Sequence, residues 1–188
     1  MANKRFWLGM LVMALVFGMT VIGCDNGTTG NGTDPALNGT WQLTMMYDIP
    51  VEELIYKEFL PEGYQAETKF NNGNYETFMN GTPMSQATYT TSGNQITITP
   101  TRLHGDYLPL MGIELESKLY SKNELKAALI ALGQDDEDIE FIDVLFSLQQ
   151  TYSYSVNGNT LTITTTITYE DEGETQTVTQ TVTYTRKN

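Results

Sequence analysis

The sequence contains one cysteine, Cys24, and one histidine, His104. Thiol and imidazole groups are common in covalent catalysis and in metal binding. Catalysis by a Cys–His or Ser–His–Asp arrangement would have to use His104. A zinc site built from several cysteines and histidines is excluded by the same count, and so is a disulfide within the chain. We therefore predict a non-enzymatic protein without a metal or cofactor, in which His104 is a polar surface residue in a loop.

Cys24 stands at the end of a segment typical of secretory signals. Lys4 and Arg5 precede an uncharged, mostly apolar stretch over 6–22. The sequence VIGC at 21–24 resembles the lipobox of bacterial lipoproteins. That resemblance implies cleavage before Cys24, which leaves 1–23 as a signal peptide, and attachment of a lipid to the cysteine sulfur. The alternative is an uncleaved membrane helix, for which about 17 apolar residues is short.

The same segment predicts where the protein is found. A lipid on Cys24 would tether it to a membrane of the bacterial cell envelope, at the periplasmic face or the cell surface. The Gly-, Asn- and Thr-rich stretch that follows has no large apolar side chain, so we expect 24–36 to be the lipidated cysteine and a flexible linker. With 23 acidic against ten basic residues, the net charge of −13 argues against a nucleic-acid partner. We expect a monomer.

From residue 37 to 188 the sequence predicts one mainly β domain. Threonine alternates with apolar residues over 160–169 and 175–186, which is the pattern of strands with one buried face. Asn-Gly pairs at 72–73 and 157–158 permit the positive φ of tight hairpins. We expect eight strands, at about 39–47, 65–71, 74–80, 86–92, 95–101, 150–157, 160–169 and 175–186. Eight antiparallel strands joined by short turns suit an up-and-down barrel.

A helical insertion interrupts this β pattern over 103–149. Ser121 and Glu124 have the spacing of a capping box, and a second, strongly apolar helix is expected over 137–148. The acidic run at 135–138 could bind calcium or could serve the dipole at the second helix's start. Because that helix is apolar on several sides, we expect it to cover one mouth of the barrel through Phe141, Leu145 and Phe146.

The start and end of the domain resemble a known family. Gly39, Thr40 and Trp41 match the G-x-W that opens the first strand of lipocalins and related calycins, and Arg186 lies near the end of the last strand. Two stretches, at 89–99 and 154–164, match a hairpin of bacterial lipocalin-like lipoproteins. The resemblance implies that Trp41 closes one end of the barrel with Arg186 packed over its ring, a cation–π contact.

The leading functional prediction is reversible binding of a small hydrophobic or amphipathic ligand inside the barrel. An interaction module that contacts a protein or host molecule through its loops and helical insertion is the alternative. The candidate wall residues could equally just fill the core. They are inward positions of the expected strands: Met45, Tyr47, Phe70, Tyr75, Ile98, Ile163, Ile167, Val182 and Tyr184.

Overall fold

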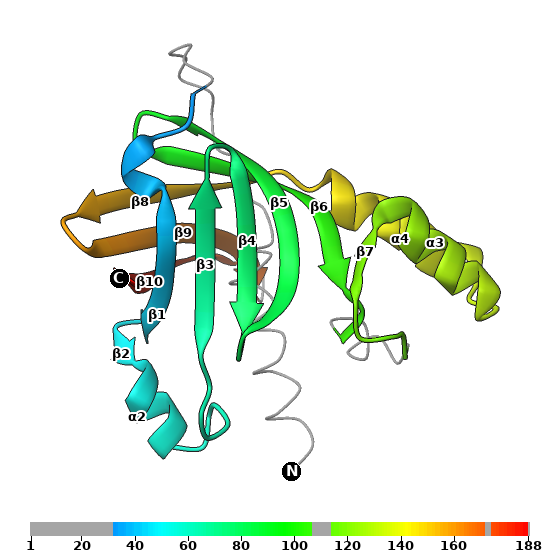
Figure 1. Ribbon diagram of the computed structural model, residues 1–188, viewed down its shortest axis with the longest axis horizontal. Coiled ribbons are helices and arrows are strands. Elements are labelled where there is room, and N and C mark those ends of the chain that lie inside the picture. The colour runs from blue at the N-terminus through cyan, green and yellow to red at the C-terminus, as the bar shows by residue number, and fades with distance from the viewer. Residues whose placement is uncertain (1–31, 107–113, 172–173, 188) are drawn as a thin grey trace.

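The computed structural model describes residues 32–106, 114–171 and 174–187. Side chains between 167 and 176 are not described, and Cys24 with the rest of the predicted signal lies outside the described residues. Eight long strands of the described chain form an antiparallel up-and-down barrel (Figure 1). They are β1 (Gly39–Met46), β3 (Ala66–Asn71), β4 (Asn74–Met79), β5 (Thr82–Ser92), β6 (Gln95–His104), β8 (Gln150–Asn157), β9 (Thr160–Asp171) and β10 (Glu174–Arg186).

The barrel closes because β1 pairs with β3 on one side and with β10 on the other. The pair Trp41–Arg186 stands at one end of the β1–β10 ladder and Met46–Val182 at the other. The predicted fold class is therefore confirmed, including the helical insertion. Closure also removes the free sheet edges that an open sheet of this length would expose.

Local sequence explains the hairpins. Asn72 and Gly73 both have positive φ, 46° and 90°, so β3 turns into β4 over two residues that tolerate this backbone conformation. Gly93 and Gly158, at 57° and 59°, serve the β5–β6 and β8–β9 turns in the same way. These three turns lie at the same end of the barrel as Trp41. This end is called the closed end below, and the opposite end is called the open end.

Residues 32–36, expected in the flexible linker, instead form part of the fold. The Thr91 backbone N–H donates to the carbonyl of Gly32 at 2.8 Å, and the Tyr154 hydroxyl donates to the carboxylate of Asp34 at 2.9 Å. A 3-10 helix, η1 (Pro35–Leu37), then places Leu37 in the core. Composition predicted disorder here because the large apolar residue that anchors the segment, Leu37, lies just beyond it.

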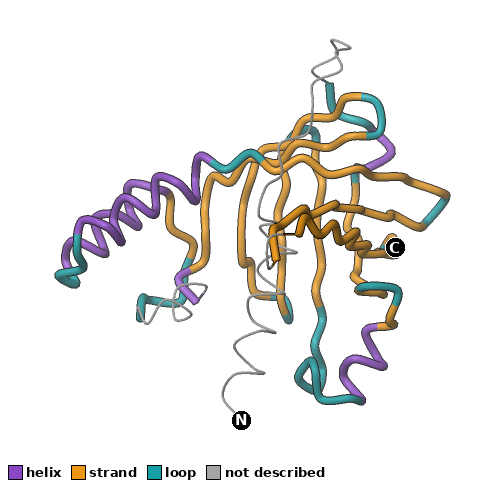
Figure 2. The backbone as a smooth tube through the Cα atoms, turned by 180° about the vertical axis from the view of Figure 1, so that it is seen from behind, coloured by secondary structure: helices purple, strands orange, loops and turns teal. Residues whose placement is uncertain are grey.

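Two short elements follow β1 at the open end. The two-residue strand β2 (Ile49–Pro50) leads into α2 (Val51–Tyr56), whose Val51 is buried against the barrel core. Figure 2 shows this helix below the strands, and the loop after it returns the chain to β3. In the described part of the chain, no helix is both long and apolar enough to cross a membrane.

The insertion forms a helical arm made of α3 (Lys122–Ala131) and α4 (Asp136–Ser147), preceded by the short strand β7 (Leu119–Ser121). The predicted capping box is present: Ser121 accepts from the Glu124 N–H, and Glu124 accepts from the Ser121 N–H at 2.8 Å. At the start of α4, Asp135 accepts from the Asp138 N–H at 3.0 Å. This part of the acidic run therefore serves the start of the helix.

The arm does not cover a mouth of the barrel, so the lid prediction was wrong. Both views show it projecting sideways from the barrel wall (Figures 1 and 2). Of the three predicted docking residues, Phe146 is buried and Leu145 half-buried in a cluster that is separate from the barrel core, and Phe141 is 40% exposed. That cluster is built from apolar residues of β6, β7 and the two helices: Leu103, Tyr120, Leu125, Leu129, Ile142 and Phe146.

The reason lies in the length of β6. Only Gln95–Ile98 pair with β8, while Arg102–His104 extend past β8 and pair with β7, with Arg102 and Leu103 still paired to β5 on their other side. The end of β6 thus offers Leu103 to the helices beside the barrel. His104 lies on the same strand end and is 3% exposed, accepting the Asp106 N–H at Nδ1 (3.3 Å), so the prediction of a surface loop histidine was also wrong.

The barrel interior as a candidate ligand site

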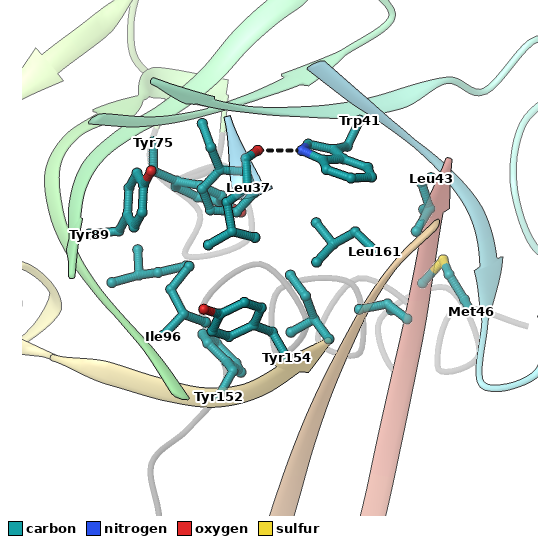
Figure 3. Packing of buried hydrophobic residues seen from close by; sticks show 14 of the residues in the cluster. Leu37, Trp41, Leu43, Met46, Tyr75, Tyr89, Ile96, Tyr152, Tyr154 and Leu161 are labelled. Carbon is teal, nitrogen blue, oxygen red and sulfur yellow. Dashed lines mark hydrogen bonds between the residues drawn. The ribbon is translucent and has the colours of Figure 1, made fainter. Parts of the chain in front are cut away.

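The closed end is sealed by Trp41, which is completely buried. Its indole Nε1 donates to the carbonyl of Leu37 at 2.6 Å (Figure 3). The Arg186 guanidinium lies 4.0 Å from the centre of the indole rings and donates to the carbonyls of Asn38 (2.5 Å) and Ala36 (2.7 Å). Arg186, on the last strand, therefore holds η1 over the end of the barrel.

Gly39 is needed for this arrangement. Its φ is 133°, a conformation that side chains disfavour, and a Cβ there would stand 2.7 Å from Nη1 of Arg186. The absence of a side chain lets the guanidinium reach the carbonyl of Asn38. The geometry thus brings Gly39, Trp41 and Arg186 together at one end of the barrel.

Large side chains fill the half of the barrel next to Trp41. The ring of Phe70 lies 5.0 Å from that of Tyr75 and 5.1 Å from that of Tyr89, the latter pair edge to face. Leu37, Ile96 and Leu161 pack around them (Figure 3). Since each of these side chains is at least nine-tenths buried, this half is a packed core.

Space remains in the other half. The larger hollow has a cavity volume of about 50 Å³, and a second one of about 20 Å³ lies beside it. Both are lined by Tyr75, Val182 and Tyr184, so they are neighbouring parts of one interior. The larger is also lined by flexible and aromatic residues of the open end, including Leu43, Met46, Tyr64, Met79 and Met84. The smaller is completed by Ile98, Tyr152, Ile163, Thr165 and Gln180.

Phenol groups lie in and beside the hollows. Burial is the main cause that raises the pKa of Tyr152 and of Tyr184 far above the ordinary tyrosine value, and neighbouring phenols add to it. Burial also raises the pKa of Tyr47, just after β1, to about 12. Among the described residues, the buried Tyr47 hydroxyl has no hydrogen-bond partner. All three phenols are therefore neutral at physiological pH and can donate or accept a hydrogen bond.

Five of the nine predicted wall residues line the hollows: Tyr75, Ile98, Ile163, Val182 and Tyr184. Phe70 belongs to the packed half, and Tyr47 packs partly buried against the core without lining a hollow. The side chain of Ile167 is outside the described residues.

The prediction for Met45 was wrong. A register irregularity lies between Leu43 and Met45 on β1, so that Met45 pairs with Thr183 while Met46 pairs with Val182. Such a bulge reverses which side chains face the core beyond it. Met46 is consequently buried in the barrel and lines the hollow, and Met45 stays half-buried outside it.

Sequence reasoning also missed several wall residues. Met84 is out of phase with the buried Ala87 and Tyr89 on β5, and Tyr64 lies in the loop before β3, so strict alternation did not mark them. Met79 has the same parity as the buried Tyr75 on β4 and could have been found. Gln180 could have been found, because it shares the inward parity of Val182 and Tyr184 on β10. Within the described residues, no group of three or more His, Cys, Asp or Glu side chains is placed to hold a metal ion.

The geometry defines a class of protein: a closed, eight-stranded antiparallel barrel, sealed at one end by a tryptophan and hollow toward the other. The family model of the lipocalin-like domain matches residues 37–126, from the end of η1 into α3. The chain therefore carries a lipocalin-like domain. Comparison with curated proteins and with solved structures gave no match.

Proposed function

We propose that this protein is a lipid-anchored protein of the bacterial cell envelope whose lipocalin-like barrel reversibly binds a small hydrophobic or amphipathic molecule, without catalysing a reaction. The observation that carries the proposal is the hollow between the packed half of the barrel and its open end. Its walls are mainly apolar, with Glu67, Thr68 and Thr77 as the other polar members, and its phenol groups can orient a ligand.

The size of the hollow limits the ligand. About 50 Å³ is far below the roughly 300–1,000 Å³ of sites for drug-sized molecules. Met46, Met79 and Met84 line it, and methionine side chains can change rotamer at low cost. A slender group such as an alkyl chain can enter by displacing them, whereas a bulky rigid ring system would clash with the packed half.

A lipid anchor on Cys24 would also determine which end of the barrel faces the membrane. Gly32, the first described residue, pairs with Thr91 at the closed end of the barrel. If Cys24 carries a lipid, the short segment between Cys24 and Gly32 tethers the closed end to the membrane. The open end would then face away from the bilayer, so that a ligand enters from the aqueous side.

A pair of adjacent residues on β10 provides a matched test. Val182 lines both hollows, whereas Thr183 lines neither and its backbone faces Met45 across the ladder. We expect Val182→Phe to weaken binding of an alkyl probe such as 1-octanol at least about tenfold, a loss of about 1.4 kcal/mol. Thr183→Phe should leave it unchanged. Equal effects of the two substitutions would exclude the barrel interior as the site.

A second candidate function rests on the helical arm. Ile130, Leu132, Phe141 and Val144 are apolar residues of the arm and are 40–62% exposed. Exposed apolar residues grouped on one structural element are typical of contact surfaces. This favours a role of the arm in binding another protein of the envelope.

Site-specific photo-crosslinking in cells would test this alternative. A crosslinker at position 141 should capture one defined protein, and one at Tyr56, which is 87% exposed on α2, should not. The same products from both positions would indicate non-specific contact only.

A further inference from the structure

Two buried amide atoms stand out in the open half of the barrel. Nε2 of Gln150 and Oε1 of Gln180 are buried and have no hydrogen-bond partner among the described residues. Gln150 is only 4% exposed, and its Oε1 already accepts the hydroxyl of Tyr152. A buried polar group without a partner destabilises the fold, because it has lost its hydrogen bonds to water. The fold therefore leaves two buried polar atoms without hydrogen bonds in the open half of the barrel.

Both glutamines adjoin the smaller hollow, Gln180 as one of its lining residues and Gln150 through the hydrogen bond that it accepts from Tyr152, which also lines it. Gln150 and Tyr152 alternate with exposed residues along β8, so both point into the barrel. Thr165 of β9 pairs with Gln180 of β10, and both line the smaller hollow together with Tyr152. One unpartnered donor and one unpartnered acceptor therefore lie at or beside the same hollow.

The two free atoms need complementary partners. Nε2 of Gln150 is a donor and Oε1 of Gln180 is an acceptor, so a group that both accepts and donates is complementary to both. Hydroxyl and primary amide groups have this property. A carboxylate cannot donate to Gln180, and an ammonium cannot accept from Gln150.

The uncharged lining of the smaller hollow also favours a neutral head group. None of the residues that line the smaller hollow is acidic or basic, and burial raises the pKa of Tyr152 and Tyr184, which keeps both phenols neutral. An ionic head group would lose its hydration there without gaining a counter-ion, which is unfavourable.

We propose that the smaller hollow, with Gln150, Tyr152 and Gln180, recognises the uncharged hydroxyl or amide head of an amphipathic molecule. The apolar tail of this molecule lies along Tyr184 toward Met46 and Met84 in the larger hollow. The ligand class is thus a neutral alkyl alcohol or amide rather than a fatty acid or an alkylamine. This inference rests on the proposed function, since it concerns the same barrel interior.

Three probes with the same eight-carbon tail isolate the head group: 1-octanol, nonanoate and octylamine, each titrated calorimetrically into the full-length protein at pH 7.5. We expect 1-octanol to bind at least about tenfold more tightly than either ion. Gln180→Leu should remove most of this preference by weakening 1-octanol alone. Gln42→Leu is the control, because Gln42 lies between the inward Trp41 and Leu43 on β1 and therefore faces outward.

A second substitution keeps the test decisive if Gln180→Leu disturbs the fold. Gln180→Glu places a carboxylate in the hollow and should shift the preference toward octylamine.

The outcomes separate the two proposals. Equal binding of the three probes, or a preference for 1-octanol that survives in both Gln180 variants, would overturn the head-group assignment while the barrel still binds ligand. No binding of any probe would mean that the hollows hold water only, and the proposed function would fail with the inference.

Discussion

The contact between Arg186 and Trp41 makes a quantitative prediction about how the barrel is closed. Replacing Arg186 by alanine removes a cation–π contact, worth about 0.5–1 kcal/mol at a partly exposed site. It also removes two hydrogen bonds from a charged donor to the carbonyls of Asn38 and Ala36. Such bonds contribute about 1.5–3 kcal/mol each when buried, and less here because Arg186 is partly exposed. We therefore expect a total loss of about 2–4 kcal/mol.

A double-mutant cycle separates these contributions. Trp41→Ala alone should cost about 3–5 kcal/mol, as for other large buried aromatic residues. The loss from Arg186→Ala should be smaller in that background, by about 0.5–1 kcal/mol or more, because the aromatic face is gone and η1 is no longer held by the indole N–H. Trp41→Leu serves as a milder partner if the alanine variant is too unstable to measure.

The assay is urea unfolding followed by circular dichroism, which yields the free energy of unfolding from the midpoint and slope. All four members of the cycle are compared at the same pH and salt concentration. Strictly additive losses would show that the two side chains do not stabilise each other. A loss from Arg186→Ala below about 0.5 kcal/mol would likewise refute the view that this guanidinium holds η1 over the barrel end.

Three further predictions concern the anchor and titrating groups. Cys24→Ala should abolish palmitate labelling and release the protein from the membrane fraction; unchanged membrane association would contradict lipidation. Because burial raises the pKa of tyrosines such as Tyr152 and Tyr184, their stabilising effect is intact below about pH 10 and lost as pH rises above it. Absorbance at 295 nm should then show some of the 11 tyrosines ionising only as the protein unfolds, whereas ionisation of all of them near pH 10 in the folded protein would contradict the packing. Backbone and side-chain hydrogen bonds from Ser121, and then Arg102, lower the pKa of Glu124 to about 2. Its stabilising effect on α3 is thus present above the ordinary value of 4.5 and lost as pH falls toward 2, and a carboxyl NMR titration with a midpoint near 4.5 would show that the capping box does not form in solution.

The strands and turns could be predicted from sequence because their signals are local. Alternation of threonine with apolar residues over β9 and β10, and positive-φ pairs such as Asn72-Gly73, each specify structure within a few residues. The capping box of Ser121 and Glu124 is local in the same sense. These signals were sufficient to predict the barrel and the two helices of the insertion.

What was missed depends on contacts between distant segments. The β1 bulge that exchanges Met45 for Met46 follows from the pairing of β1 with β10, about 140 residues later in the chain. The position of the helical arm follows from how far β6 extends past β8, which no periodicity in the arm reveals. The orphaned amides of Gln150 and Gln180 become visible only when β8 and β10 are placed around one interior.

Methyl NMR of the protein labelled at its methionines tests the central claim, a ligand-binding barrel interior, most directly. Of the nine methionines, Met46, Met79 and Met84 line the larger hollow, while Met45 is the neighbouring control outside it. Titration with 1-octanol should shift the methyl signals of those three residues saturably and leave that of Met45 nearly unchanged. Signals that stay fixed throughout, or a shift at Met45 as large as at Met46, would contradict ligand binding inside the barrel.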